Sequence, residues 1–191
     1  AVHRNGKGFV INHFYNYIQS QVLTVSGNQD YNGDGLMDLV VNDGRATSYV
    51  VLGKTNTNPI SLTSFQAIDG FTISGPYVSN VGTIGDFNGD GYVDTLAGLW
   101  NGSTWTNSYI LFGDGTASNK TFAVSGNTNG IYVTTDRDLY ANLPPVVLGD
   151  FNGDGLADLI VGANLSDPAA GSNAGRSYVI FGASDGSTGQ T

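Results

Sequence analysis

The chain has 191 residues, of which 40% are hydrophobic and 11% aromatic, a mixture that can bury a substantial core. It has no cysteine, which excludes a disulfide scaffold, and its seven Lys and Arg against 16 acidic residues disfavour nucleic-acid binding. No apolar run reaches the roughly 18 residues that a membrane span needs. Glycine is abundant, with 28 copies, and glutamate is absent, so we expect an all-β protein with many turns.

The N-terminal segment, residues 1–22, is rich in aromatic residues. Apolar residues at positions 10, 14, 17, 18 and 22 would suit an amphipathic helix, but the β-propensity of this stretch argues against one. We interpret it as an edge strand or a partial repeat. A docking segment for a neighbouring subunit is the alternative.

A nine-residue pattern then occurs three times, at residues 30–38, 86–94 and 150–158. Each copy places an oxygen-bearing side chain at positions 1, 3, 5 and 9, and a glycine at position 6. With the backbone carbonyl of position 7, the candidate ligands are Asp30, Asn32, Asp34, Leu36, Asp38, Asp86, Asn88, Asp90, Tyr92, Asp94, Asp150, Asn152, Asp154, Leu156 and Asp158.

Electrostatics predicts a cation in each copy of this pattern. Carboxylates about 4 to 5 Å apart repel one another by roughly 1 kcal/mol per pair in water, and by more near a protein surface. Calcium accepts six to eight oxygen ligands in flexible geometry, whereas magnesium demands a strict octahedron. Zinc and copper would call for His or Cys, which the loops lack. We therefore predict three Ca²⁺ sites, whose six positive charges would offset most of the formal charge of −9.

Two other interpretations of the pattern fit less well. Asn, Asp and Gly also build tight turns without any metal, but three matching copies leave that interpretation little room. An EF-hand needs a Glu at position 12 and flanking helices. Position 12 is Val41, Ala97 and Val161 here, and the residues after each loop are short, β-branched apolar runs. Each loop should lead into a strand.

Motifs on both sides of the loops extend the repeat. Similar five-residue apolar motifs stand upstream at residues 23–27, 71–75 and 122–126, and a Ser-Tyr motif ending in glycine stands downstream at 48–53, 108–113 and 177–182. We expect repeats over residues 23–70, 71–121 and 122–191. Each repeat then offers three or four strands, as the blade of a β-propeller does.

The second repeat contains a hairpin with Trp100 and Trp105 on either side of an Asn-Gly turn. Aromatic rings beside polar loops can stack on sugars, so this hairpin is a candidate glycan site. Packing of both rings between blades is the simpler interpretation. Three sequons, at Asn101, Asn119 and Asn164, match the glycosylation pattern but are common by chance in such a composition.

Catalytic signatures are lacking. The sequence has no Cys nucleophile, no G-x-S-x-G elbow and no His in a recognisable motif with a serine. Nine of the 16 Asp residues already belong to the metal loops. We expect a binding or assembly module and no enzyme.

The repeats resemble those of the FG-GAP family, the blades of the integrin α-subunit propeller and its bacterial relatives. The third repeat is most similar, through residues 149–163 and 175–182, although the Gly-Ala-Pro element survives only as Gly-Ala-Asn at residues 162–164. The resemblance implies calcium in the loop between the first two strands of each blade. It also implies structural ions, with partners docking elsewhere on the propeller.

Three blades cannot close a ring, because propellers need at least about four. The chain is therefore expected to be a fragment of a longer propeller or a subunit that associates with copies of itself to complete one. We expect an extracellular or cell-surface protein, where weak oxygen-ligand calcium sites are filled. Its expected role is adhesion or assembly through protein contacts, and the alternatives are a lectin and the non-catalytic propeller part of a larger secreted enzyme.

Overall fold

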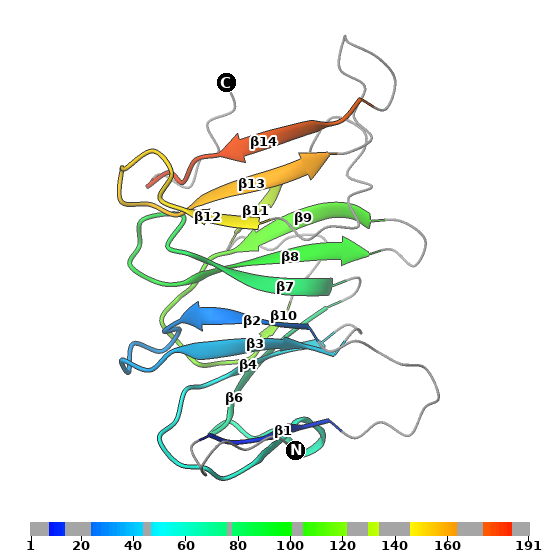
Figure 1. Cartoon of the computed structure of the whole chain (residues 1–191), viewed down its shortest axis with the longest axis vertical. Helices are drawn as coiled ribbons and strands as arrows, with labels where there is room; N and C mark the ends of the chain where they lie inside the picture. The colour runs from blue at the N-terminus through cyan, green and yellow to red at the C-terminus, as the bar shows by residue number, and fades with distance from the viewer. Residues whose placement is uncertain are drawn as a thin grey trace.

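Figure 1 shows the computed structural model of the chain, an open stack of β-sheets. The structure describes residues 8–13, 24–43, 47–75, 78–100, 105–121, 130–133, 146–163 and 174–184. In these residues the regular elements are strands, apart from one 3₁₀ turn, η1 (Leu62–Ser64). The all-β prediction is confirmed, and the sheets have the meander topology of propeller blades.

The first sheet is built on four antiparallel strands that follow one another along the chain. They are β2 (Thr24–Gln29), β3 (Asp38–Asn42), β4 (Thr47–Val51) and β6 (Gly70–Ser74). Successive residues of β3 and β4 are buried on both faces of the sheet, because Val40 and Val50 pack into one hydrophobic cluster and Val41 and Val51 into another.

The second and third sheets repeat this order. The second contains β7 (Val78–Gly85), β8 (Asp94–Trp100), β9 (Trp105–Leu111) and β11 (Gly130–Val133). The third contains β12 (Val146–Gly149), β13 (Asp158–Ala163) and β14 (Arg176–Ile180) within the described part of the chain.

The strand pairing divides the repeats at other places than the sequence motifs suggested. Strand β6 pairs with β4, so residues 71–74 end the first sheet, whereas we expected them to open the second repeat. In the same way β11 pairs with β9 and belongs to the second sheet, not to the repeat expected from residue 122. A short apolar motif is compatible with either the first or the fourth strand of a sheet. Only the observed strand pairing shows which of the two positions the motif occupies. Residues 122–129 lie outside the described ranges.

Two short strands lie, in sequence, between the third and fourth strands of a sheet but pair with a strand outside that sheet. Strand β10 (Lys120–Thr121) pairs in parallel with β6, and β5 (Ile60–Ser61) pairs in parallel with β1 (Ile11–Asn12). We call β5 and β10 the clasp strands. They occupy equivalent places, since β5 begins at residue 60 before β6 at 70, and β10 begins at 120 before β11 at 130. Residues 14–23 of the N-terminal segment lie outside the described ranges.

The hydrophobic core lies between neighbouring sheets. Val40 and Val50 of the first sheet pack with Tyr109 and Leu111 of the second in one buried cluster. A second cluster joins the second sheet to the third, through residues such as Ile110 and Leu159. A third covers the opposite face of the first sheet with residues from β5 and η1, against which Phe9 and Ile11 pack. Burial between faces holds the sheets in a stack.

Candidate metal sites

The three predicted loops join the first strand of each sheet to the second, and they lie along one side of the stack, at left in Figure 1. In all three, the carboxylate of position 1 accepts hydrogen bonds from backbone N–H groups further along the loop. Asp30 Oδ1 accepts from Gly33 at 2.8 Å and from Asp34 at 3.1 Å, and its Oδ2 accepts from Gly35 at 2.7 Å. Asp86 and Asp150 repeat this set.

Positions 3 and 5 complete the loop. Asn32 Oδ1 accepts from the backbone N–H of Asp34 at 3.1 Å, and Asp34 Oδ1 accepts from Leu36 N–H at 2.8 Å. The same contacts recur in the other two loops. These Asx turns curl the chain around the side-chain oxygens. Each carboxylate oxygen that accepts one hydrogen bond keeps a second lone pair with which it can bind a cation.

Glycine at position 6 allows this curl. Gly35 has a φ of 84°, and its counterparts Gly91 and Gly155 have φ of 87° and 90°. This left-handed conformation is strained for residues with a Cβ. Backbone geometry therefore explains why all three copies of the pattern have glycine at position 6.

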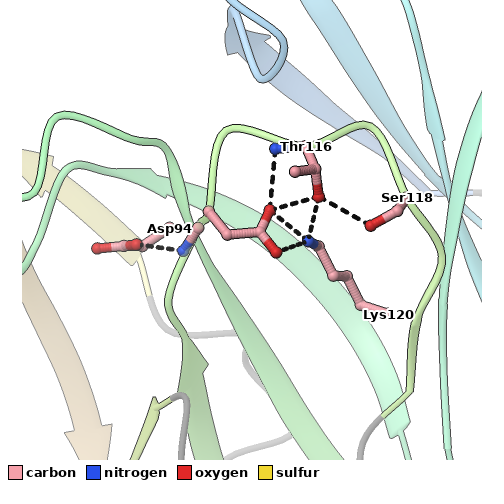
Figure 2. Close-up of polar contacts among 6 residues, drawn as sticks. Asp94, Thr116, Ser118 and Lys120 are labelled. Atoms are coloured by element: carbon pink, nitrogen blue, oxygen red, sulfur yellow. Dashed lines mark hydrogen bonds and ion pairs between the residues drawn. The ribbon is translucent and has the colours of Figure 1, made fainter.

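The carboxylate at position 9 lies deeper than the others. Asp38, Asp94 and Asp158 are each 0% exposed. Asp94 Oδ2 accepts the N–H of Phe87 at 2.8 Å, and its Oδ1 accepts the N–H of Gly113 at 2.8 Å. Figure 2 shows the second of these bonds. Position 9 thus ties its loop to the end of the third strand of the same sheet.

Burial affects how these carboxylates titrate. Desolvation raises the pKa of Asp94 to about 6, although the N–H groups of Gly113 and Phe87 act to lower it. Desolvation also raises the pKa of Asp38 above its usual range, with smaller contributions from Asp34 and Asp30. A buried carboxylate beside two other carboxylates is an environment that a divalent cation would stabilise.

The glycine that closes the Ser-Tyr motif has a role that the sequence did not reveal. A Cβ on Gly53 would lie 2.6 Å from Cβ of Leu36, and one on Gly113 would lie 2.5 Å from the carbonyl oxygen of Val93. Gly182 is equally crowded, against the carbonyl of Ala157. Only glycine lets the third strand end against the metal loop. The available signal was the recurrence of this glycine at the end of the Ser-Tyr motif downstream of each loop.

The second and third loops are joined through their backbones. Ala157 N–H, at position 8 of the third loop, donates to the carbonyl of Asp86 at 2.8 Å, and Ala183 N–H donates to the carbonyl of Phe87 at 3.0 Å. Between the first two repeats, Tyr31 and Thr95 share a hydrogen bond between hydroxyls at 3.2 Å. The loops therefore belong to the interfaces between sheets.

Beyond Gly113 lies a polar cluster that supports the second clasp strand (Figure 2). Lys120 forms an ion pair with Asp114, and Thr116 donates to Asp114 through both its backbone N–H and its hydroxyl. Although partial burial acts to raise it, the hydrogen bonds from Lys120 and Thr116 lower the pKa of Asp114 to about 2. This cluster anchors the start of β10 (Lys120–Thr121).

The donor set of each loop fits calcium. It consists of three carboxylates, one amide oxygen and the position 7 carbonyl, all of them hard oxygen ligands. In the described residues, no group of three or more His, Cys, Asp or Glu side chains converges closely enough to hold a metal ion. The loop carboxylates are turned instead toward backbone N–H groups, as described above. The residue types and the loop shape suit the ion, whereas the ligand distances of a bound state are not formed.

The two tryptophans of the candidate glycan site lie at the end of β8 and at the start of β9. The structure pairs Trp100 with Trp105 across β8 and β9, and the turn at 101–104 lies outside the described residues, as do the two indole rings. The sugar-binding interpretation stays a prediction.

Comparison with protein families agrees with this geometry. The pattern of the FG-GAP repeat matches residues 146–180, and that of the FG-GAP-like repeat matches residues 30–97. The matched ranges contain all three loops. No curated protein matches the chain significantly.

The chain belongs to the FG-GAP repeat family, and its sheets are β-propeller blades of that type. Such repeats are typical of extracellular proteins and often mediate binding. None of the described residues forms a helix long and apolar enough to cross a membrane.

Proposed function

We propose that this chain is a calcium-stabilised, non-catalytic β-propeller module that works outside the cell, where it binds proteins or assembles with copies of itself. One observation carries the calcium part of this proposal: three loops, far apart in sequence, fold the same set of oxygen donors around left-handed glycines with nearly identical hydrogen bonds.

The loop side chains would hold the ion. Positions 1, 3, 5 and 9 supply side-chain oxygens, and the position 7 residues Leu36, Tyr92 and Leu156 supply carbonyls. When bound, calcium would supply positive charge that offsets the repulsion among these carboxylates. Position 9 already links each loop to the third strand of its sheet, so neutralising the loop would stabilise the whole blade.

The binding role is supported by the family and by the charge of the chain. FG-GAP repeats form rigid scaffolds whose loops vary, an arrangement suited to recognition. Protein contacts fit a chain with 16 acidic residues better than nucleic acid does. The Trp100 and Trp105 hairpin leaves a glycan ligand as a second candidate, which a glycan array on the wild-type chain and on the Trp100→Ala variant would test.

Calorimetric titration tests the calcium proposal. Calcium added to the chelator-treated chain should bind and should raise the melting temperature, whereas magnesium at the same concentration should do so less, because its octahedral preference fits the loop poorly. Equal melting temperatures in calcium and in chelator would contradict the proposal.

A further inference from the structure

One peptide group of the third metal loop is hydrogen-bonded to the second loop. The carbonyl of Leu156, at position 7, is a candidate calcium ligand, and it belongs to the same peptide group as the N–H of Ala157. This N–H donates to the carbonyl of Asp86, at position 1 of the second loop, at 2.8 Å. Because a peptide group is planar and rigid, its carbonyl cannot be fixed in one loop without its N–H being fixed against the other.

The connection continues to a candidate ligand of the second site. The carbonyl of Asp86 shares its peptide group with the N–H of Phe87, and this N–H donates to Asp94 Oδ2 at 2.8 Å. Asp94 is the buried carboxylate at position 9 of the second loop. Two peptide groups in series therefore connect the position 7 carbonyl of the third loop to the position 9 carboxylate of the second. Hydrogen bonds in such a series polarise one another.

A second connection runs beside the first. Ala183 N–H donates to the carbonyl of Phe87, at position 2 of the second loop, at 3.0 Å. The preceding residue, Gly182, donates its N–H to Oδ1 of Asp158, at position 9 of the third loop, at 3.0 Å. Residues 182 and 183 therefore join the position 9 carboxylate of the third loop to the backbone of the second.

Close packing accompanies these hydrogen bonds. A Cβ on Gly182 would lie 2.7 Å from the carbonyl oxygen of Ala157 and 2.7 Å from that of Phe87. A Cβ on Gly89, at position 4 of the second loop, would lie 3.2 Å from Cδ2 of Leu156. The second and third loops are thus in direct contact, with little space between them for either to rearrange alone.

The first and second loops are not connected in this way. The residues equivalent to the two donors are Val93 and Asp114, and those equivalent to the two acceptors are Asp30 and Tyr31. All four lie within the described ranges, and no backbone hydrogen bond between described residues joins the first loop to the second. Instead, Tyr31, Val93 and Asp114 all line a small cavity of about 20 Å³.

We infer that calcium binds to the second and third loops with positive cooperativity, whereas the first loop binds its ion independently. An occupied third loop would hold the Leu156–Ala157 peptide group in place, and with it the backbone of Asp86. The second loop then loses less conformational freedom when its own ion binds. By linkage, an occupied second loop favours binding at the third by the same factor. The inference rests on the proposed calcium function and concerns how the filling of the sites is regulated.

Electrostatics opposes this coupling. An ion in one loop makes that loop less negative and so weakens its attraction for an ion in the next loop. Salt screens this effect between exposed charges. The effect acts on the first and second loops as well as on the second and third, so a comparison of the two pairs separates it from the coupling through the backbone.

Calorimetric titration of chains with disabled loops tests the inference. Asp→Asn at position 5, in Asp34, Asp90 or Asp154, removes a ligand outside the connecting series, and asparagine keeps an acceptor for the turn. Chains with one intact loop give the individual binding constants. In Asp34→Asn, which keeps the second and third loops, the overall constant should exceed the product of the individual constants by about fivefold. In the matched control Asp154→Asn, which keeps the first and second loops, we expect no excess.

Amide hydrogen exchange measured by NMR provides a second test, in the chains with one intact loop. When calcium fills the third loop alone, the amide of Phe87 in the disabled second loop should exchange about fivefold more slowly. When calcium fills the second loop alone, the equivalent amide of Tyr31 in the disabled first loop should be unchanged. This comparison assigns the coupling to the backbone hydrogen bonds.

The outcomes distinguish this inference from the calcium proposal. Intact loops that bind calcium, with no greater excess in Asp34→Asn than in Asp154→Asn, would overturn the coupling and leave the calcium sites in place. Equal slowing of the Phe87 and Tyr31 amides would also overturn it. A folded wild-type chain that binds no calcium would overturn both.

Discussion

The first and third metal loops share one conformation but differ in their surroundings. Position 1 accepts the same three backbone N–H groups in both, through Asp30 and through Asp150. At position 2, however, Tyr31 is 9% exposed and Phe151 is 66% exposed. Loop shape is thus fixed by local hydrogen bonds, whereas burial of the aromatic residue depends on the next sheet in the stack.

This difference separates two sources of stability. The Asx turns and the left-handed glycines need no neighbour, so each loop can form from its own nine residues. The aromatic residue at position 2 contributes only where another sheet covers it, as Phe87 is covered by Leu159 and Val161. Variants at equivalent positions can therefore measure the two contributions independently.

The largest contrast is expected at position 2. Phe87→Ala removes a fully buried ring from the core between the second and third sheets and should cost about 4 kcal/mol of unfolding free energy. Phe151→Ala, measured by the same urea titration at a protein concentration low enough to keep the chain monomeric, should cost less than about 1 kcal/mol. Equal losses would show that Phe151 is buried in solution.

The second-largest loss of stability is expected at position 9. Asp94→Ala would leave the buried N–H groups of Phe87 and Gly113 without an acceptor, and we expect a loss of about 3 kcal/mol even in chelator. Asp94→Asn retains an acceptor oxygen and should lose less. If Asp94→Ala lowered the free energy of unfolding by less than about 1 kcal/mol, these two hydrogen bonds would not stabilise the loop.

Position 5 should have a smaller effect whose sign depends on calcium. Asp90→Asn removes one ligand, and we expect one fewer calcium bound per chain and a lower melting temperature in calcium. In chelator the same variant should be slightly more stable than the wild type, by roughly 0.5 kcal/mol, because one repulsive carboxylate is gone. A variant less stable than the wild type in both conditions would point to a role in the turn alone.

The smallest effect should come from the ion pair that anchors the second clasp strand. The folded pKa of Asp114 is lowered to about 2, so its contribution is present above the unfolded pKa and is lost as the pH falls toward 2. Asp114→Asn should therefore be slightly less stable than the wild type at pH 6, and the two should converge near pH 2. Because the carboxylate is 46% exposed, the difference should be small. A difference in stability between Asp114→Asn and the wild type that stays constant with pH would exclude the ion pair as its cause.

The sequence predicted what is local and missed what depends on neighbours. The three loops, the strands after them and the all-β class follow from residue types and spacing, since Asp, Asn and Gly dictate the turn and β-branched residues the strand. The predicted boundary between the first and second blades was wrong at residues 71–74, which pair with β4 of the first sheet. The apolar Phe-Thr-Ile-Ser motif does not indicate which strand it will pair with. The steric role of Gly53 and the exposure of Phe151 depend on chain segments that pack from elsewhere.

Counting bound calcium tests the central claim most directly. Equilibrium dialysis of the chelator-treated chain against radioactive calcium at millimolar concentration should give three ions per chain, and Asp34→Asn, Asp90→Asn and Asp154→Asn should each remove one. A folded chain that binds no calcium under these conditions would contradict the proposal that the three loops are metal sites.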